Sequence, residues 1–337
     1  MEPTVSLVRV RRGGHVESLH RGLVALWEGA RLKAVLGDPQ ALTFYRSSSK
    51  PLQALAAVTL GAADAYGLTP AELALASGSH SGAPLHVAAA RSILAKAQVP
   101  EALLGCGGHW SIDADVAHQQ RLTASSPGAV LSNCSGKHAL MLAGARHLGA
   151  TLHDYLAPTH PLQRQIREDV ARFAGLTSEQ AAVSIDGCGA PTFAVPLAAM
   201  ACSIARLAAP FDLPEPLARA ATRLVEAMRA YPEMVAGEGR FDTELMRAGA
   251  GAFVAKGGAE GLHVVAVPRL ALGLVVKVED GSDRGYRLVV VEVLRRLGLL
   301  SDAQALTLAE KQGHKTQKNF AGRTIGELEV LLPASFP

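Results

Sequence analysis

The sequence has few aromatic residues and no long hydrophobic run. Phe, Trp and Tyr make up only 4% of the 337 residues, so Ala, Leu and Val must fill most of the core. No run of about 18 apolar residues occurs, which argues against a transmembrane helix. The N-terminal "MEPTVSLVRVRRGG" lacks the continuous apolar segment and small-residue cleavage site of a secretory signal. We therefore expect a cytoplasmic protein.

Cysteine is also scarce and widely spaced. The four cysteines are Cys106, Cys134, Cys188 and Cys202. A chain of this size with so few cysteines is not built on a disulfide scaffold. Free thiols or a metal site are the two remaining explanations.

Neither sign of charge dominates the sequence. The formal net charge is +3, and Lys and Arg are scattered along the chain. The densest basic segment, "RVRRGGH" at 9–15, is short and contains no aromatic residue, so we interpret it as a solvated edge. Nucleic-acid binding requires a basic stripe, which this sequence does not show.

The pattern of apolar residues predicts an α/β (α+β) protein. Alternation predicts strands at 5–12, 18–29 and 31–38, and again at 251–268 as a hairpin and at 270–280. Helical spacing predicts helices over 50–67, 69–77, 84–99, 136–150, 160–176, 192–209, 214–232 and 286–298. Because the strands lie near both chain ends, we expect one domain over 1–337. Its sheet lobe combines about 1–45 with 250–337, and a mostly helical region covers about 46–249.

A serine–lysine pair stands at the expected start of the helix over 50–67. In "FYRSSSKPLQ", Ser47 and Lys50 are three residues apart, so their side chains share one face of a helix. A half-buried lysine loses its proton more easily and can then accept the proton of a serine hydroxyl. The alternative is ordinary: Ser48 or Ser49 caps the helix and Lys50 lies in water.

Two further segments carry the same residue types. Ser79 lies in "ASGSHSG", between a short apolar run and the start of a helix. Lys256 lies in "FVAKGGAEG", at the end of a predicted strand. Ser–Lys acyl-transfer enzymes place a second base on a strand in this manner. Each segment also has an ordinary explanation, a serine turn and a surface lysine.

Cys134 and Cys188 lie in polar surroundings, at what the pattern indicates are strand-to-helix transitions. Their segments are "LSNCSGKHALML" and "IDGCGAPTF". Thiolates suit zinc, but neither cysteine belongs to a C-x-x-C pair. Zinc ligation, buried structural thiols and a reactive cysteine all remain open on this pattern.

Six blocks together resemble one known family. "YRSSSKPLQ", "ASGSHSG", "LSNCSGKHALML", "DGCGAPTF", "YPEMVAGEGRFDTELM" and "KGGAEG" occur in this order. The set is similar to the rhizobial-type L-asparaginases, the asparaginase II family, over about Val8 to Gly298. The resemblance implies a serine β-lactamase-like fold, a homodimer, and hydrolysis of the L-asparagine side-chain amide.

The resemblance also implies roles for individual residues. Two Ser–Lys pairs, Ser47 with Lys50 and Ser79 with Lys256, would form the catalytic set. A zinc ion would be held by Cys134, Cys188 and, unusually, Lys137. The implied substrate-binding residues are Arg46 for the α-carboxylate, Asp186 for the α-ammonium, and Asn133 and His138.

The sequence departs from many relatives at Gly78, Ala83 and Gly108, while the hydroxyls and amines remain. A glutaminase or another Ser–Lys amidase is one alternative function. A β-lactam-interacting enzyme and an inactive zinc-binding homologue are two others.

Overall fold

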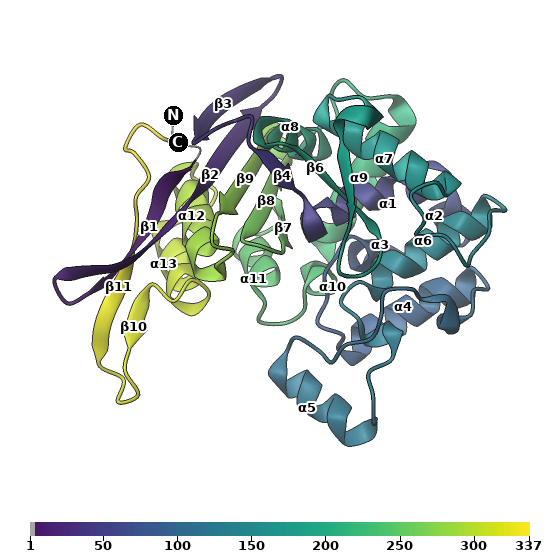
Figure 1. Ribbon diagram of the computed structural model, residues 1–337, viewed down its shortest axis with the longest axis horizontal. Helices are drawn as coiled ribbons and strands as arrows, with labels where there is room; N and C mark the ends of the chain where they lie inside the picture. Colours follow the sequence, from purple (N-terminus) through teal and green to yellow (C-terminus); the bar gives the residue numbers. More distant parts are fainter. Residues whose placement is uncertain (1–3) are drawn as a thin grey trace.

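An eight-stranded antiparallel sheet, built from both ends of the chain, organises the structure (Figure 1). The computed structural model describes residues 4–337. The strand order is β10-β11-β1-β2-β9-β8-β7, and β3 pairs with β2 outside this path. The strands are β1 (Val5–Arg12), β2 (His15–Glu28), β3 (Arg31–Leu36), β7 (Val254–Gly258), β8 (Leu262–Val267), β9 (Leu272–Val278), β10 (Thr316–Lys318) and β11 (Thr324–Val330).

The middle of the chain is mostly helical and lies beside the sheet, at the right of Figure 1. Its helices are α1 (Lys50–Thr59), α2 (Ala62–Ala65), α3 (Pro70–Ala76), α4 (Pro84–Lys96), α5 (Ala114–Thr123), α6 (Ser135–His147), α7 (Pro161–Ala174), α8 (Leu197–Ala208), α9 (Glu215–Ala230), α10 (Pro232–Val235) and α11 (Phe241–Ala248). Near the C-terminus, α12 (Asp283–Arg296) and α13 (Asp302–Lys311) return to the sheet. The expected α+β architecture, an antiparallel sheet from both chain ends with a helical region, is confirmed. The expectation of one domain over 1–337 includes residues 1–3, which lie outside the described residues.

Helices cover both faces of the large sheet. In β9, Gly273 faces α8, because a Cβ there would collide with the Ala201 carbonyl oxygen of that helix. Successive side chains of a strand point to opposite faces, and Val278 is five residues from Gly273, so it points to the other face. A Cβ at Gly285 of α12 would contact Val278 there, so α12 lies on the face opposite to α8. Among residues 4–337, no helix combines the length and the apolar content needed to cross a membrane.

A second, three-stranded sheet was not expected from the sequence. It consists of β4 (Leu42–Phe44), β6 (Pro191–Pro196) and β5 (Ala182–Ile185), with β6 in the centre. The prediction of one helix over 192–209 is therefore wrong in its first part. Thr192, Phe193 and Val195 favour a strand, and α8 begins only after Pro196.

The helix predicted over 50–67 is divided in two. Gly61 adopts a positive φ of 91°, which breaks α1 from the short α2. The helices predicted at 69–77 and 84–99 are present as α3 and α4. Thr69 Oγ1 accepts a hydrogen bond from Glu72 N at the start of α3, and Glu72 Oε2 accepts one from Thr69 N.

Candidate active site

The "RSSS" segment forms a 3-10 turn, η1 (Arg46–Ser49), before α1 begins at Lys50. Tyr45 fixes its start, because this fully buried side chain hydrogen-bonds through its hydroxyl to Ser203 Oγ at 2.7 Å. Arg46 has a positive φ of 49°, a conformation that is uncommon for residues other than glycine. Backbone strain of this kind is typical of functional sites and is maintained by the surrounding structure.

The three serines of this turn have different surroundings. Ser48 Oγ donates to Tyr45 O at 2.7 Å, and Ser49 Oγ donates to Arg46 O at 2.9 Å. The alternative in which one of them caps α1 is therefore wrong, because both hydroxyls bind carbonyls of the preceding turn. Ser47 instead lines a cavity.

Lys50 is fully buried at the start of α1. Its Nζ donates to Asn133 O at 3.1 Å, and it also interacts with the Cys134 sulfur. Burial lowers the pKa of Lys50, and the charge of Lys137 acts in the same direction. Among the described residues, no hydrogen bond joins the side chains of Ser47 and Lys50, although the two residues are only three positions apart.

Ser79 lies in a loop that is held against the segment following α10. Ser79 N donates to Val235 O at 2.7 Å, and a side chain at Gly78 would collide with that same carbonyl. Gly237 has a φ of 114°, and a Cβ there would approach Ser81 Oγ closely. The two glycines thus allow the two loops to touch. Ser79 Oγ is buried and has no hydrogen-bond partner among residues 4–337.

Lys256 lies within β7 rather than at the end of the strand. It is buried, and its Nζ lies 3.6 Å from Asp242 Oδ2 and donates to Gly257 O at 2.6 Å. Burial lowers the pKa of Lys256 to about 8, against the opposing effect of the Asp242 carboxylate. Gly258 allows β7 to approach η1, since a Cβ there would lie 2.9 Å from Tyr45 O.

Asp242 connects Lys256 to a buried histidine. Its Oδ1 lies 2.9 Å from His263 Nε2, and its Oδ2 accepts a hydrogen bond from Gly257 N at 2.9 Å. Burial opposes the charge of Asp242, but Lys256 and His263 lower the pKa of this carboxyl far below its ordinary value. The sequence analysis did not identify Asp242 or His263. The block "YPEMVAGEGRFDTELM" contains Asp242, so the signal was present but no role was assigned to it.

One cavity of about 590 Å³ brings four of the expected residues together: Ser47, Ser79, Asn133 and Lys256 all line it. Its remaining wall comes from α11 and the loop before it, β7 and the residue after it, α12, the segment before α5, and Gln312. Lys50 is not among the described residues that line this cavity, because its side chain is covered by the protein.

Two of the expected substrate-binding residues are bonded to each other. Arg46 Nε donates to Asp186 Oδ1 at 2.8 Å, and burial of Asp186 is outweighed by this guanidinium, which lowers the pKa of the carboxyl. His138 is fully buried, and its Nδ1 lies 2.6 Å from Tyr155 Oη. Its Nε2 has no partner within residues 4–337. None of these three residues lines the described cavity.

The expected metal ligands lie together beside Lys50. Cys134 is at the start of α6, after a 3-10 turn, and Cys188 is in the turn between β5 and β6. The expected strand-to-helix transitions are therefore wrong for both cysteines. Lys137 Nζ donates to Cys188 Sγ at 3.2 Å, and all three side chains are buried. A hydrogen bond between the two sulfurs lowers the pKa of Cys134 and raises that of Cys188.

This donor set is compatible with zinc, which binds thiolate sulfur and neutral nitrogen. Among residues 4–337, no three His, Cys, Asp or Glu side chains form a group that could hold a metal ion. A zinc ion between Cys134 and Cys188 would therefore require Lys137 as its third protein ligand. Cys106 and Cys202 are buried free thiols elsewhere in the core.

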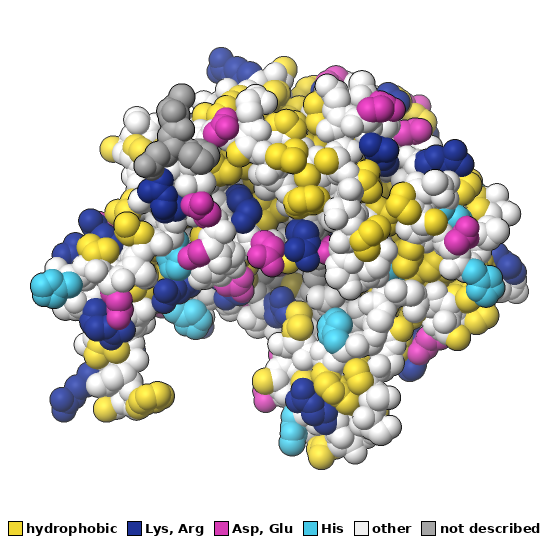
Figure 2. Space-filling view, in the orientation of Figure 1, with side chains coloured by type: hydrophobic (Ala, Val, Ile, Leu, Met, Phe, Trp, Pro, Cys, Tyr) yellow, Lys and Arg dark blue, Asp and Glu magenta, His cyan; other side chains and the backbone are white. Residues whose placement is uncertain are grey.

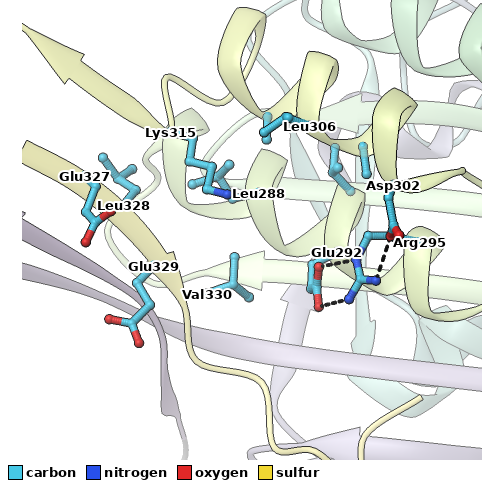
Figure 3. A pocket seen from close by; sticks show the side chains of 13 residues that line it. Leu288, Glu292, Arg295, Asp302, Leu306, Lys315, Glu327, Leu328, Glu329 and Val330 are labelled. Atoms are coloured by element: carbon cyan, nitrogen blue, oxygen red, sulfur yellow. Dashed lines mark hydrogen bonds and ion pairs between the residues drawn. The ribbon is translucent and has the colours of Figure 1, made fainter. Parts of the chain in front are cut away.

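A second cavity, of about 350 Å³, lies between α12, α13 and β11 (Figure 3). Its wall is formed by aliphatic side chains such as Leu288 and Leu306, and at its edge Arg295 binds Glu292 and Asp302. No serine or cysteine lines it among the described residues, so it lacks the residue types expected of a catalytic site. On the face shown in Figure 2, basic and acidic side chains are interspersed, in agreement with a surface that carries no basic stripe there.

Comparisons with known proteins place the chain in a family. Curated protein sequences gave no significant match. A crystal structure of Mglu in its native form shows 15% identity and a TM-score of 0.46, covering 83% of this chain and 64% of that chain. The chain thus spans less than two thirds of the length of that Mglu chain.

Two β-lactamase structures are also similar in outline. A putative β-lactamase from Bacteroides dorei DSM 17855 gives 12% identity and a TM-score of 0.40, covering 86% of this chain and 91% of that one. A class C β-lactamase from Rhodobacter sphaeroides gives 16% identity and 0.39, covering 85% and 94%. With TM-scores below 0.5, these likenesses do not bear on the activity of this chain. The sequence matches the family model for L-asparaginase II over residues 8–330, nearly its whole length, and the chain therefore belongs to the L-asparaginase II family.

Proposed function

We propose that the protein hydrolyses the side-chain amide of L-asparagine to L-aspartate and ammonia, with Ser47 as the nucleophile. The observation that carries this proposal is the single cavity lined by Ser47, Ser79 and Lys256, in a chain of the L-asparaginase II family. Of the serines in the η1 turn, Ser47 lines this cavity, whereas Ser48 and Ser49 are hydrogen-bonded to backbone carbonyls.

The proposed reaction has two stages. Neutral Lys50 takes the proton of Ser47, and the Ser47 oxygen attacks the amide carbon. Lys50 then gives this proton to the amide nitrogen, so that the C–N bond breaks, ammonia leaves and a β-aspartyl ester remains on Ser47. Water hydrolyses this ester to L-aspartate and regenerates the Ser47 hydroxyl. Because Lys50 Nζ is bonded to Asn133 O, the first transfer requires a different Ser47 rotamer or a connecting water. Ser79 and Lys256 would relay protons on the other side of the cavity.

Arg46, Asn133, His138 and Asp186 remain the proposed substrate-binding set. Asp186 is suited to an α-ammonium group, since Arg46 already holds it as a carboxylate. The oxyanion that forms during attack also requires fixed hydrogen-bond donors, such as backbone N–H groups. A homodimer also stays a proposal, and sedimentation analysis would test it.

Zinc is proposed at Cys134, Cys188 and Lys137. When bound, it would fix the loops that carry the two cysteines and require Lys137 in its neutral form. Metal analysis of protein purified without chelator tests this directly. We expect close to one zinc per chain and its loss in Cys134→Ser; a content below about 0.1 equivalent would count against the site.

The central test compares Ser47→Ala with Ser49→Ala in an ammonia-release assay. We expect Ser47→Ala to lose at least about 10³-fold in kcat, as for other removed nucleophiles. Ser49→Ala, in the same turn but bound to Arg46 O, should stay within about threefold. Turnover of Ser47→Ala near the parent rate would remove Ser47 from its role. Parallel assays with glutamine and a β-lactam distinguish the alternative substrates, since one methylene is worth only about 1–3 kcal/mol.

A further inference from the structure

The cavity that contains Ser47, Ser79 and Lys256 also contains a cation with no counter-charge. Arg240 lies at the start of α11 and lines this cavity. No hydrogen bond or ion pair joins its guanidinium to any residue of 4–337. A half-buried guanidinium in this position has five donors available and carries a permanent charge.

The other charged groups that line the cavity are already engaged. Each acidic group has a partner, and so does each of the two other cations. The contacts are Asp242 with Lys256 and His263, Asp283 with Arg287, Glu238 with Arg247, Asp113 Oδ1 with Val116 N, and Arg287 with Gln312 O. Among the described residues, Arg240 is therefore the one cation lining this cavity that has no hydrogen-bond or ion-pair partner. A bound anion would supply that partner.

Arg240 follows two exposed residues, Glu238 and Gly239, but contacts with neighbouring segments hold this loop in place. The preceding residue, Gly239, accepts a hydrogen bond through its carbonyl from Gln312 Nε2 at 2.9 Å. Gly237 packs against Ser81, which fixes the other side of the loop. The charge of Arg240 is close enough to lower the pKa of Lys256, although burial is the larger cause. Arg240 thus lies near the groups proposed for the reaction.

A second unsatisfied group lines the same cavity. Ser79 Oγ is buried and has no partner among the described residues. Leaving a buried hydroxyl unpaired is unfavourable, so a ligand that bonds to it is favoured. A guanidinium and a hydroxyl in one cavity match the acceptors of a carboxylate, which binds arginine in a planar, bidentate manner.

We infer that Arg240 is the carboxylate receptor of this cavity, so that the substrate class is amides that carry a carboxylate. The inference rests on the proposed amide hydrolysis and deepens it. It assigns to Arg240 the role that the family resemblance implies for Arg46. The structure favours Arg240, because Arg46 Nε is bonded to Asp186 and Arg46 does not line the described cavity.

The test measures kcat/KM for L-asparagine and for 3-aminopropanamide, which is asparagine without its carboxylate. Arg240→Met should lower kcat/KM for asparagine by roughly 100-fold, since a charge-assisted bidentate contact is lost. For 3-aminopropanamide it should change kcat/KM by no more than about twofold. Arg240→Lys should recover part of the asparagine rate, because it restores the charge without the planar fork.

Arg223→Met is the control, because it removes a guanidinium that pairs with the exposed Asp64 and does not line the cavity. Its ratio of the two kcat/KM values should equal that of the parent. If Arg240→Met leaves the ratio of kcat/KM for asparagine to kcat/KM for 3-aminopropanamide unchanged, as it does when both substrates lose equally, the inference is overturned. A shift of the ratio in Arg46→Met alone would also overturn it and assign the role to Arg46.

Binding of L-aspartate, measured by calorimetry, separates this inference from the proposed function. If the parent binds aspartate but releases no ammonia from asparagine, the proposed function fails and Arg240 is still testable. In that case a roughly 10-fold or greater rise in Kd for Arg240→Met supports the receptor role. An unchanged Kd in a folded Arg240→Met or Arg240→Lys variant rejects it.

Discussion

Two buried lysines, one in the helical region and one in the large sheet, have contrasting surroundings. Lys50 is bonded to a main-chain carbonyl and lies beside Cys134, without a carboxylate among its hydrogen-bond partners. Lys256 lies 3.6 Å from the Asp242 carboxylate, which His263 and Gly257 N hold in place. Burial lowers the pKa of both lysines; the Cys134 sulfur opposes this effect at Lys50, and the Asp242 carboxylate opposes it at Lys256.

This difference indicates two different tasks. A lysine without a nearby carboxylate loses its proton readily, which suits a base beside a nucleophile. A lysine whose pKa is about 8 can exchange a proton near neutral pH, which suits a relay. The same residue type, buried in both cases, thus faces a cysteine sulfur in one site and a carboxylate in the other.

The largest expected effect comes from removing the base on the helical side. Lys50→Met should reduce kcat for asparagine by about 10³-fold or more, because the Ser47 proton loses its acceptor. Lys256→Met should reduce it less, by about 10²-fold, if that lysine only relays protons. Steady-state kinetics of both variants decide the comparison. A larger loss for Lys256→Met would reverse the two assignments.

The next effect is on stability rather than rate. Asp242→Asn should lower the free energy of unfolding by about 3 kcal/mol, because it leaves a buried lysine without its counter-charge. Asn133→Ala is the control for Lys50. Lys50 Nζ binds the main-chain oxygen of residue 133, and this hydrogen bond is retained when the side chain is removed. Urea unfolding of the two variants measures the difference. Equal, small losses would show that the Asp242 pair contributes nothing.

The pH dependence gives a third expectation. If Lys256 acts as a base, kcat/KM rises with pH through about 8 and levels above it, a change of about fivefold between pH 7 and 8. Asp242 raises the pKa of Lys256, so Asp242→Asn should move this limb to lower pH. The groups that set the limb are Asp242, Lys50, Arg240 and Cys134. If the rise of kcat/KM with pH stays at the same pH in Lys256→Met, it reports the titration of another group.

The same lysine affects stability with a defined sign. Its pKa in the folded state, about 8, lies below the ordinary value of 10.5. Between these two values the unfolded chain binds more protons, so the contribution of Lys256 to stability rises with pH across this window. Thermal unfolding between pH 8 and 10 should show this rise in the parent and a weaker one in Lys256→Met.

The smallest effect is expected at the exposed edge of the site. Glu260 approaches Arg46 to 4.0 Å and is largely exposed. Glu260→Gln should change the free energy of unfolding by less than about 0.5 kcal/mol, because exposed ion pairs contribute little. Chemical denaturation checks this. If Glu260→Gln lowered the free energy of unfolding as much as Asp242→Asn, the exposed Arg46–Glu260 pair would contribute as much as the buried Asp242–Lys256 pair, against this prediction.

Much of the local structure was predicted correctly from the sequence, and the wrong predictions have clear physical causes. The strand–helix alternation, the hairpin of β7 and β8, and the helix opened by Thr69 were all predictable from short-range patterns. The strand β6 was not, because Phe193 and its neighbours continue an apolar run into α8, and only pairing with β4 and β5 makes it a strand.

The candidate site divides in the same way. The Ser47–Lys50 spacing and the Ser79 loop were readable from sequence, because chemistry-bearing residues stood in recognisable short blocks. Asp242, His263 and Arg240 were not assigned roles, since their importance depends on which charges face them across elements that are distant in the chain.

The sequence by itself determined the residue types, the turns that present them, and a fold with strands at both ends of the chain. Only the tertiary structure decided which hydroxyl lines the cavity, which lysine meets a carboxylate, and which arginine lacks a partner. The reason is physical: spacing governs contacts within a turn, whereas burial and charge pairing depend on segments brought together by folding.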